Sequence, residues 1–555
     1  MDNFVKVTCL NNRLSKDYKL GTSLAEIAKD MGVETKYPIL GARINNKLSE
    51  LSYLVYNPKF IEFIDISNID GYRMYQRSLS FVLMKATRDT FPDAQLKIEH
   101  SISKGFYCVL EKETKLLPED VLKIAERMRQ IVKSDLPFKR NQIPTEDAIE
   151  KFREFNLLEK VKLFETRPTL FTSVYSLDNQ IDYFHGFLVP STGYLKIFDL
   201  IPYYDGMLLR FPSPNNPEEL GEVIEQQKLF EIFQEFKDWS EILGVSTIGS
   251  INEAVQNGRA SELIKVSEAL NEKKVALIAD EICERKDVKL VLIAGPSSSG
   301  KTTFSKRLAI QLKVLGINSL PVSIDNFFVN REDTPKDENG EYDYESLYAL
   351  DLDVFNTTMN NLIEGKPTVI PGFDFHSGQR VFKNTESVIL PEKSVLIVEG
   401  IHGLNPKLSE HIDSKLIFKV YVSALTQLGI DWHNRIPSTD NRLIRRLVRD
   451  FQYRGYSPVD TLKRWPSVRS GEDKNIFPFQ EEANVMFNSA LLYELGILKK
   501  YAEPLLKKVP ENVPEFSEAK RLLKFLSYFV DIEEDEEIPP TSILREFLHG
   551  SSFHY

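Results

Sequence analysis

The residues best suited to chemistry form one short loop in the second half of the chain. Residues 295–302 read Gly-Pro-Ser-Ser-Ser-Gly-Lys-Thr, which fits the spacing G-x-x-x-x-G-K-[ST]. In this spacing backbone N–H groups wrap a phosphate, the lysine reaches the outer phosphates and the threonine hydroxyl binds Mg²⁺. We therefore expect an ATP site with these residues in contact: Gly295, Ser297, Ser298, Ser299, Gly300, Lys301, Thr302 and Thr303.

Two acidic residues follow predicted strands near this loop. Residues 320–324 lead into Asp325, and residues 394–398 lead into Glu399. The carboxyl ends of parallel strands meet at one edge of a sheet, which is where such sheets bind ligands. Asp325 is expected to orient or deprotonate an attacking hydroxyl, although a lone aspartate here could also be a helix cap. Thr302, Asp325 and Glu399 are the predicted Mg²⁺ ligands.

Arginines recur on one face of a predicted helix. Arg442, Arg445, Arg446 and Arg449 are spaced i, i+3, i+4 and i+7, and Arg454 follows shortly after. Such a stripe is usually a solvated face, but beside a phosphate loop it can stabilise charge on a phosphoryl group in transfer. We favour the second interpretation. The predicted catalytic residues are Lys301, Asp325, Arg446 and Arg449.

The elements around the loop predict a doubly wound α/β domain. A buried-strand pattern over residues 288–294 precedes the loop, and a helical pattern over 303–314 follows it. Further strands are expected at 320–324, 394–398 and 416–422. Strands that alternate with helices in this way specify a parallel sheet in a three-layer α/β/α sandwich. The [NT]-K-x-D tetrapeptide of guanine-nucleotide sites does not occur, which disfavours a GTPase.

The rest of the chain divides into further units. Residues 1–66 form a small α+β module, in which Ser23 and Glu26 are spaced as a capping box. Residues 67–205 are expected to be a second α+β domain, and 206–287 a helical connector. The P-loop domain is predicted to span 288–510. Residues 511–555 are expected to be a C-terminal tail, whose acidic run at 531–537 has the character of solvated surface.

Length and composition bound the class of protein. The chain has 555 residues, 42% of them hydrophobic and 27% charged, as in ordinary globular proteins of about three to four domains. The net charge of −11 excludes a global cationic field for nucleic acid. Three scattered cysteines argue against a disulfide framework, and no run reaches the roughly 18–20 apolar residues of a membrane span. We expect a cytoplasmic protein without membrane contact.

Several segments of the P-loop part resemble the uridine kinase and phosphoribulokinase family. They are GPSSSGKTTFSKRL, SIDNFF, IPGFDFHSGQR, VLIVEGIHGLN and RLIRRLVRD. The resemblance implies a kinase that uses ATP and Mg²⁺. It matches Asp325 to the catalytic aspartate, Asp343 to the residue that binds ribose hydroxyls, and Arg446 and Arg449 to lid arginines. The expected acceptor-binding residues are Asp343, Phe373, His376, Arg446 and Arg454.

The positions that read a pyrimidine base in that family differ here. A Tyr, a His, an Arg and a Gln are replaced by Phe373, Gly378, Tyr456 and Arg464. Loss of polar partners for the base weakens discrimination, because hydrogen-bonding sites supply the large specificity ratios. Another nucleoside or a related polyol therefore stays open as the acceptor, with His376 in contact with it.

The front half resembles parts of threonyl-tRNA synthetase. GTSLAEIAKDMG and ARINNKLSELSYLV resemble a TGS domain, a small β-grasp module, and YQRSLSFVLMKATRDTFPDAQLKIEHSISKGFYCVL resembles the start of the second additional domain of that synthetase. In that family an H-x-x-x-H pair on one helix face binds metal for editing. Arg77 and Phe81 occupy those positions and cannot bind zinc, so we expect no editing hydrolysis and no stoichiometric zinc.

Taken together, the chain resembles bacterial TGS-domain nucleoside kinases. This implies ATP-dependent phosphorylation of a nucleoside 5′-hydroxyl, with uridine as the first candidate. Two alternatives stay open: a phosphoribulokinase- or pantothenate-type small-molecule kinase, and a translation-linked RNA-binding regulatory ATPase. RNA contact through the front modules and a homo-oligomeric state are likewise left open.

Overall fold

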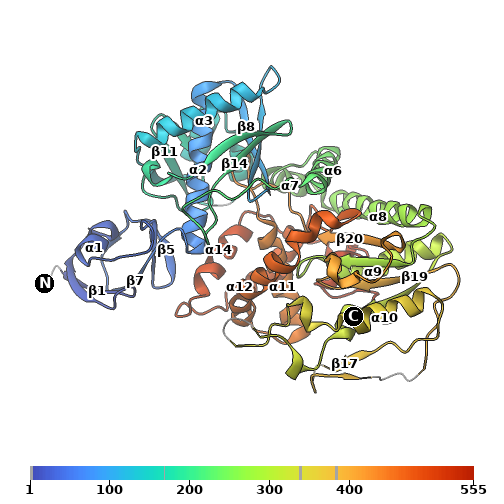
Figure 1. Ribbon diagram of the computed structural model, residues 1–555. Helices are drawn as coiled ribbons and strands as arrows, with labels where there is room; N and C mark the ends of the chain where they lie inside the picture. The colour runs from blue at the N-terminus through green and yellow to red at the C-terminus, as the bar shows by residue number, and fades with distance from the viewer. Residues whose placement is uncertain (1–3, 168, 337–339, 375, 382–385, 555) are drawn as a thin grey trace.

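The computed structural model describes residues 4–167, 169–336, 340–374, 376–381 and 386–554. Figure 1 shows three parts: a small N-terminal module on the left, a second part above, and a large part at the lower right that contains the parallel sheet. The chain ends against this last part, close to α10 in the view of Figure 1. Among the described residues, no helix has both the length and the apolar character that crossing a membrane requires.

The N-terminal module packs one helix against a mixed sheet. The sheet order is β2-β1-β7-β4-β5, and β3 and β6 form a separate short pair. The Ser23 hydroxyl accepts from the Glu26 N–H, and the Glu26 carboxylate accepts from the Ser23 N–H, which confirms the predicted capping box. The elements are β1 Phe4–Cys9, β2 Ser15–Lys19, β3 Thr22–Ser23, α1 Leu24–Asp30, β4 Gly41–Ile44, β5 Lys47–Ser49, β6 Leu54–Val55 and β7 Lys59–Ile64.

The second part combines two antiparallel sheets with four helices. One sheet has the order β13-β14-β9-β8 and the other β10-β11-β12. The long helix α2 packs on α3, and both contribute to one apolar core with the four-stranded sheet. The elements are α2 Ile69–Thr90, β8 Gln95–Ile102, β9 Gly105–Glu111, α3 Pro118–Lys133, β10 Lys139–Pro144, α4 Thr145–Glu154, α5 Leu158–Glu165, β11 Phe171–Leu177, β12 Gln180–Asp182, η1 Thr192–Tyr194, β13 Asp199–Tyr203 and β14 Gly206–Arg210.

The helical connector begins later than the sequence pattern predicts. Residue 205 lies inside the β13–β14 hairpin, so the four-stranded sheet continues to Arg210. Residues 217–226 are not helical, and the end of this stretch is bonded to the β8–β9 turn instead. The Ile224 N–H donates to the Ser103 hydroxyl at 2.6 Å, and the Gln226 side chain accepts from the Ser103 N–H at 2.7 Å. The connector helices are α6 Gln227–Leu243, α7 Ile248–Gln256 and α8 Ala260–Glu284.

The large part contains the predicted parallel sheet. Its order is β16-β19-β15-β20-β21, and every neighbouring pair is parallel. One face packs on α8, α9, α11 and α13, and the other on α10 and α6, which makes three layers. The strands are β15 Leu290–Ala294, β16 Asn318–Ser323, β19 Ser394–Glu399, β20 Ile417–Ser423 and β21 Val485–Asn488; the helices are α9 Lys301–Val314, α10 Leu352–Ile363, α11 Ser438–Arg454, α12 Pro458–Asn475 and α13 Glu494–Leu506.

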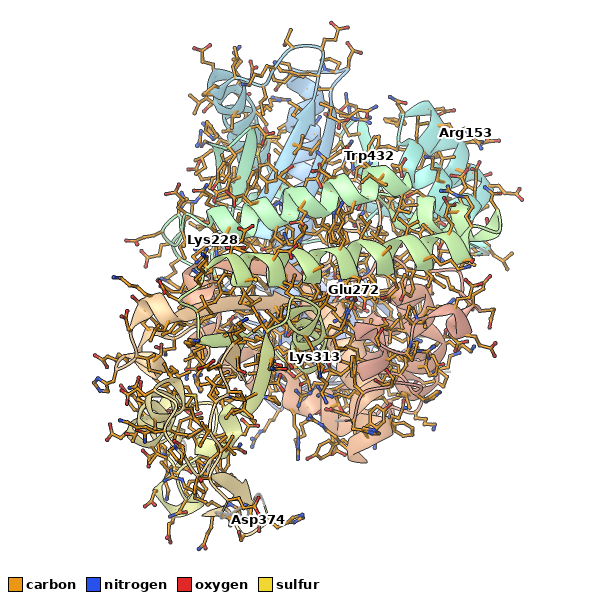
Figure 2. All side chains as sticks on the ribbon, turned by 90° about the vertical axis from the view of Figure 1, so that its right-hand side faces the viewer. Arg153, Lys228, Glu272, Lys313, Asp374 and Trp432 are labelled. Atoms are coloured by element: carbon orange, nitrogen blue, oxygen red, sulfur yellow. The ribbon has the colours of Figure 1, made fainter. Side chains whose placement is uncertain are left out.

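Smaller elements complete this part of the fold. A hairpin of β17 Gly372–Asp374 and β18 Gln379–Val381 projects from the sheet, with Asp374 at its far end in Figure 2. The same view shows α6 and α8, marked by Lys228 and Glu272, lying across the molecule between the second part and the parallel sheet. The short helices are η2 Ile324–Phe327, η3 Arg331–Asp333, η4 Leu347–Ala349, η5 Pro406–Ser409, η6 Ser414–Leu416, η7 Phe477–Glu482 and η8 Asp535–Glu537.

The C-terminal segment is part of the core rather than a peripheral tail. It contains the helix α14 Phe516–Leu526 and ends with η9 Ile543–Glu546, a 3₁₀ turn. Ile543, Leu544 and Phe547 are fully buried in the main apolar core, because apolar side chains at these positions pack against α9 and α11. The expectation of a separate tail over 511–555 is corrected accordingly.

Candidate active site

The predicted phosphate loop connects β15 to α9. Its backbone takes left-handed angles at Ser298 (φ 59°) and Gly300 (φ 82°), which coil the chain tightly. At Gly295 a Cβ atom would lie 1.9 Å from the carbonyl oxygen of Val422, so a glycine is required there. The Lys301 ammonium donates to the carbonyl oxygens of Gly295 at 2.9 Å and Pro296 at 3.2 Å, across the mouth of the loop. This is strand, loop and helix as the sequence predicts.

Thr302 and Glu399 meet at the carboxyl end of the sheet. The Thr302 hydroxyl lies 3.0 and 3.1 Å from the two carboxylate oxygens of Glu399, which ends β19 beside β15. Burial raises the pKa of Glu399, against the opposing effect of Lys301, and Asp325 adds to the rise. Hydroxyl and carboxylate oxygens are the ligands that Mg²⁺ prefers, so Thr302, Glu399 and Asp325 fit the ion and would hold it.

Asp325 stands at the end of β16, within the short helix η2. The cap of that helix is Ser323, whose hydroxyl accepts from the Asp325 N–H at 3.2 Å. The carboxylate of Asp325 is therefore not needed as a cap. It is open to water, yet the protein atoms around it raise its pKa, while Lys301 acts in the opposite direction. These contacts place an accessible carboxylate on the Lys301 side of the loop.

The predicted lid arginines differ in their partners. Arg446 donates to the Ser297 hydroxyl at 2.7 Å and pairs with Asp450 at 3.1 Å. Arg449 pairs with Asp450 at 2.7 Å. Arg454 is exposed at the end of α11, 3.7 Å from Asp450. Arg446 is thus brought to the phosphate loop, whereas the ion pairs of Arg449 and Arg454 are to Asp450.

Two other arginines of the stripe are buried anchors, a role that their spacing does not reveal. Arg442 donates to the carbonyl oxygen of Ser297 at 3.0 Å and pairs with Glu472. Arg445 is fully buried against Glu494 and the P-loop side of the sheet. The Glu472 carboxylate in turn accepts from the Ser297 N–H at 2.9 Å. This face of α11 is therefore fixed against the loop and is not a solvated stripe.

An acidic residue from the end of the chain also reaches the loop, and nothing in the sequence pattern indicates it. The Glu546 carboxylate accepts from the Thr303 N–H at 3.2 Å and from its hydroxyl at 2.8 Å. Ile543 closes over the loop, since a Cβ atom on Gly300 would lie 2.5 Å from its Cγ2. Thr303 is in the first turn of α9, where unpaired N–H groups bind anions. Glu546 thus occupies a donor that a phosphate could use.

The predicted acceptor-binding residues lie in two places. Asp343 accepts from the Glu345 N–H at 3.1 Å. The pKa of Glu345 is raised by burial, and the positive charges of Lys301 and Arg446 oppose that rise, so this segment borders the loop. Phe373 belongs to the β17–β18 hairpin, with its ring 5.4 Å from that of Phe328, and β17 contacts η2. His376 is exposed in the turn of that hairpin. The structure brings Asp343 toward the loop and leaves His376 on the outer turn.

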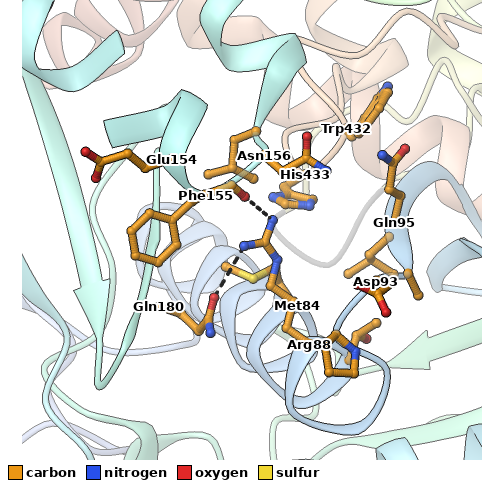
Figure 3. Close-up of a pocket in the computed structure, with 15 residues that line it drawn as sticks. Met84, Arg88, Asp93, Gln95, Glu154, Phe155, Asn156, Gln180, Trp432 and His433 are labelled. Carbon is orange, nitrogen blue, oxygen red and sulfur yellow. Dashed lines mark hydrogen bonds between the residues drawn. The ribbon is translucent and has the colours of Figure 1, made fainter. Parts of the chain in front are cut away.

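A cavity lies elsewhere, between the second part and the large part. It has a volume of about 370 Å³ and is lined by residues of α2, α4 and β12 together with Trp432 and His433. Figure 3 shows Arg88 at its centre, donating to the Phe155 carbonyl oxygen at 2.7 Å and to Gln180 at 3.5 Å. The P-loop residues are not among its lining residues, so it is a space between domains and not the phosphate site.

The positions that would bind metal in a synthetase are filled differently. Phe81 is buried, with its ring 5.2 Å from Phe184 and 5.8 Å from Phe138. Arg77 donates to the Phe187 carbonyl oxygen at 3.1 Å. No group of three or more His, Cys, Asp or Glu side chains suited to a metal occurs in the described part of the chain. The zinc-free state itself stays a prediction.

Comparison with known proteins assigns the large part. Residues 290–492 match a family described as "Phosphoribulokinase / Uridine kinase family". This likeness covers the part of the chain that holds the parallel sheet and the phosphate loop. The match ends just before α13, and it covers the sheet, the loop and α11.

The N-terminal region matches threonyl-tRNA synthetases. It is 31% identical over 198 residues to the threonine–tRNA ligase of Desulforamulus reducens, which is 36% of this chain and 31% of the ligase. The chain thus spans about a third of the length of that relative. Among solved structures, a "possible uridine kinase" from Bacillus stearothermophilus is 16% identical, with a TM-score of 0.25 over 36% of this chain and 89% of that one. A D-glycerate 3-kinase from Cryptococcus neoformans is 13% identical, with a TM-score of 0.20 over 46% and 87%.

Proposed function

We propose that this kinase transfers the γ-phosphoryl group of ATP to the 5′-hydroxyl of a nucleoside, with uridine as the first candidate. The observation that carries the proposal is the meeting of Lys301, Thr302, Glu399 and Asp325 at one edge of the parallel sheet. These residues supply phosphate contacts, Mg²⁺ ligands and an accessible carboxylate, which is what phosphoryl transfer needs.

In the proposed reaction Asp325 receives the proton of the attacking hydroxyl. The hydroxyl oxygen forms a bond to the γ-phosphorus, the bond from that phosphorus to the β,γ-bridging oxygen breaks, and ADP leaves. Mg²⁺, when bound, neutralises charge on the β- and γ-phosphates. In this proposal Lys301 and Arg446, which both contact the loop, stabilise charge on the transferring group, and Asp343 binds the ribose hydroxyls, as the family resemblance implies.

The nucleoside is proposed on the family membership together with the carboxylates that border the loop. The family also contains phosphoribulokinases, so a sugar phosphate or another small polyol is the second candidate acceptor. Substitution of Phe373 and Gly378 for polar base contacts favours a kinase with relaxed base selection.

A panel of acceptors distinguishes these functions. Purified protein with ATP and Mg²⁺ is incubated separately with each ribonucleoside, ribulose 5-phosphate and pantothenate, and phosphorylated products are identified by mass spectrometry. A nucleoside 5′-monophosphate supports the proposal. Phosphorylation of another compound alone overturns the nucleoside, and ATP hydrolysis without a phosphorylated acceptor supports a regulatory ATPase.

A further inference from the structure

Four cationic side chains gather where the second part meets the C-terminal helix α14. They share one neighbouring segment, residues 183–187, and form what we name the cationic cluster: Arg77, Arg140, Arg167 and Lys524. Arg77 donates to the Phe187 carbonyl oxygen at 3.1 Å, and the guanidinium of Arg140 lies 5.2 Å from the Phe187 ring. Two arginines from α2 and β10 therefore contact the same residue.

The other two members reach the same segment from the opposite side. Arg167 lies 4.4 Å from the Tyr528 ring centre and donates to Ser527 at 2.8 Å. Tyr528 hydrogen-bonds through its hydroxyl to Tyr183, and the Lys524 ammonium lies 6.0 Å from the Tyr183 ring. Lys524 and Tyr528 belong to α14 and the turn after it. The kinase part thus supplies one cation to a cluster that the second part begins.

The cationic cluster has no carboxylate partner in the described structure. None of its four members forms an ion pair within 4.0 Å with a described Asp or Glu. The acids nearby are already neutralised: Glu518 pairs with Arg73 and Arg521, and Asp440 pairs with Arg521. Glu50 faces the edge of the cluster, where it accepts from the Tyr175 hydroxyl at 2.6 Å. Four positive charges thus stand together with one acid at their margin.

The cluster also contains polar atoms without partners. Arg167 Nε and His185 Nδ1 are buried and make no hydrogen bond in the described structure. The protein atoms packed around Lys524, with repulsion from the three arginines, lower its pKa to about 7 although part of the side chain reaches solvent, and desolvation lowers the pKa of Arg77 to about 10. Unpaired charges of one sign that are partly withdrawn from water, as at Arg77 and Arg167, destabilise a fold unless a counter-charge is supplied. An anion would satisfy both the charges and the open hydrogen-bonding positions.

We propose that the cationic cluster binds a small multivalent phosphorylated anion that joins the second part to α14. Guanidinium groups form paired hydrogen bonds with phosphate oxygens, which favours phosphate over a simple halide. Arg77 and Arg167 are half-buried, whereas Arg140 and Lys524 are exposed. The partial burial of Arg77 and Arg167 favours a small ion, because the backbone of a nucleic acid would contact only the exposed pair. The site is separate from the P-loop and goes beyond the proposed kinase activity.

Calorimetric titration with pyrophosphate tests the site. The titration uses the full-length chain with the substitution Lys301→Ala, because this variant binds less phosphate at the P-loop. We expect one pyrophosphate per chain, and a dissociation constant raised about 10-fold or more by Lys524→Gln or by Arg140→Gln, since each removes a charged hydrogen bond. Lys520→Gln is the matched control, because Lys520 is exposed on the same helix.

The outcomes are distinguishable from those of the kinase assay. Arg140 is exposed, so Arg140→Gln keeps the test valid even if a buried variant fails to fold. Absence of pyrophosphate binding, or binding unchanged by both cluster variants, overturns the inference. Binding of a single-stranded RNA oligonucleotide without binding of pyrophosphate overturns it in favour of a nucleic-acid surface. A protein that phosphorylates no nucleoside but binds pyrophosphate through Lys524 retains this site and loses only the proposed acceptor.

Discussion

Lys301 is the side chain on which phosphate binding depends most directly. Its ammonium donates to two carbonyl oxygens of the loop, and burial lowers its pKa. The negative charge of a bound phosphate would raise that pKa again. We expect Lys301→Ala to reduce turnover by at least about 100-fold with the fold intact, because it removes a charge that stabilises the transferring group. Steady-state kinetics and circular dichroism check this. Lys313→Ala, exposed near the end of the same helix, is the control; near-normal turnover of Lys301→Ala would contradict the site.

Asp325 is expected to act on the acceptor more than on ATP. Asp325→Asn keeps the shape and removes the charge, so we expect kcat to fall roughly 10²- to 10⁴-fold with ATP affinity changed far less. Equilibrium ATP binding and acceptor turnover are measured on the same preparation, with Asp333→Asn, an exposed neighbour, as the control. A variant that binds ATP much more weakly but turns over normally at saturation would make Asp325 a nucleotide or metal contact.

The pH dependence of the reaction follows from the same carboxylate. The protein atoms around Asp325 raise its pKa above its ordinary value of about 4 although the carboxylate is open to water, and a general base must be unprotonated to act. The rate therefore rises with pH through this raised pKa, and kcat/KM falls as the pH is lowered through it. We expect this acid limb in the wild-type profile and its loss in Asp325→Asn. If the acid limb persists unchanged in Asp325→Asn, a group other than Asp325 causes it.

At the scale of elements, the C-terminal turn η9 covers the first turn of α9. Its Glu546 carboxylate holds the Thr303 N–H and hydroxyl, and its negative charge opposes a phosphate at the same helix start. Glu546→Gln should therefore tighten ADP binding by about five-fold, the equivalent of about 1 kcal/mol. Fluorescence titration with ADP measures it, with exposed Glu536→Gln as the control. Weaker binding in Glu546→Gln would mean that the carboxylate shapes the loop instead.

At the scale of the whole molecule, a buried charge network joins the second part to the large part. The Lys160 ammonium lies 2.8 Å from Asp182 and 2.8 Å from Asp431, and His433 lies 2.6 Å from Asp182. Burial alone would raise the pKa of Asp182, but Lys160 and His433 lower it well below the ordinary range. A carboxyl with a lowered pKa stabilises the fold above the pKa that it has when unfolded, near 4, and this contribution is lost as the pH falls below that value.

Removal of the cation from this network should destabilise the molecule. Lys160→Met leaves buried Asp431 without its cationic partner and buried Asp182 with His433 alone, so we expect the free energy of unfolding to fall by about 3–5 kcal/mol. Urea unfolding at neutral pH measures it, and Lys151→Met, exposed on α4, should change stability little. Equal stability of Lys160→Met and wild type would show that water or local rearrangement neutralises the pair.

Local patterns in the sequence are enough to predict the strand, loop and helix of the phosphate site. At Gly295 the Val422 carbonyl oxygen leaves no space for a Cβ atom, and Gly300 has a left-handed backbone angle. The run of apolar residues before them is the buried strand β15. The capping box at Ser23 and the strand-end position of Glu399 follow from the same kind of local signal. Residues 217–226 show the limit of such signals, because contacts with the β8–β9 turn override their helical periodicity.

Tertiary structure alone decides which distant side chains meet at these sites. Glu546 reaches Thr303 from 243 positions away, and Glu472 reaches Ser297 from 175. Arg442 and Arg445 share their helical spacing with Arg446, yet packing of α11 against the sheet buries the first two and leaves the third beside the loop. Spacing fixes which face of a helix a residue occupies, while the packing of helices and sheets determines what that face contacts.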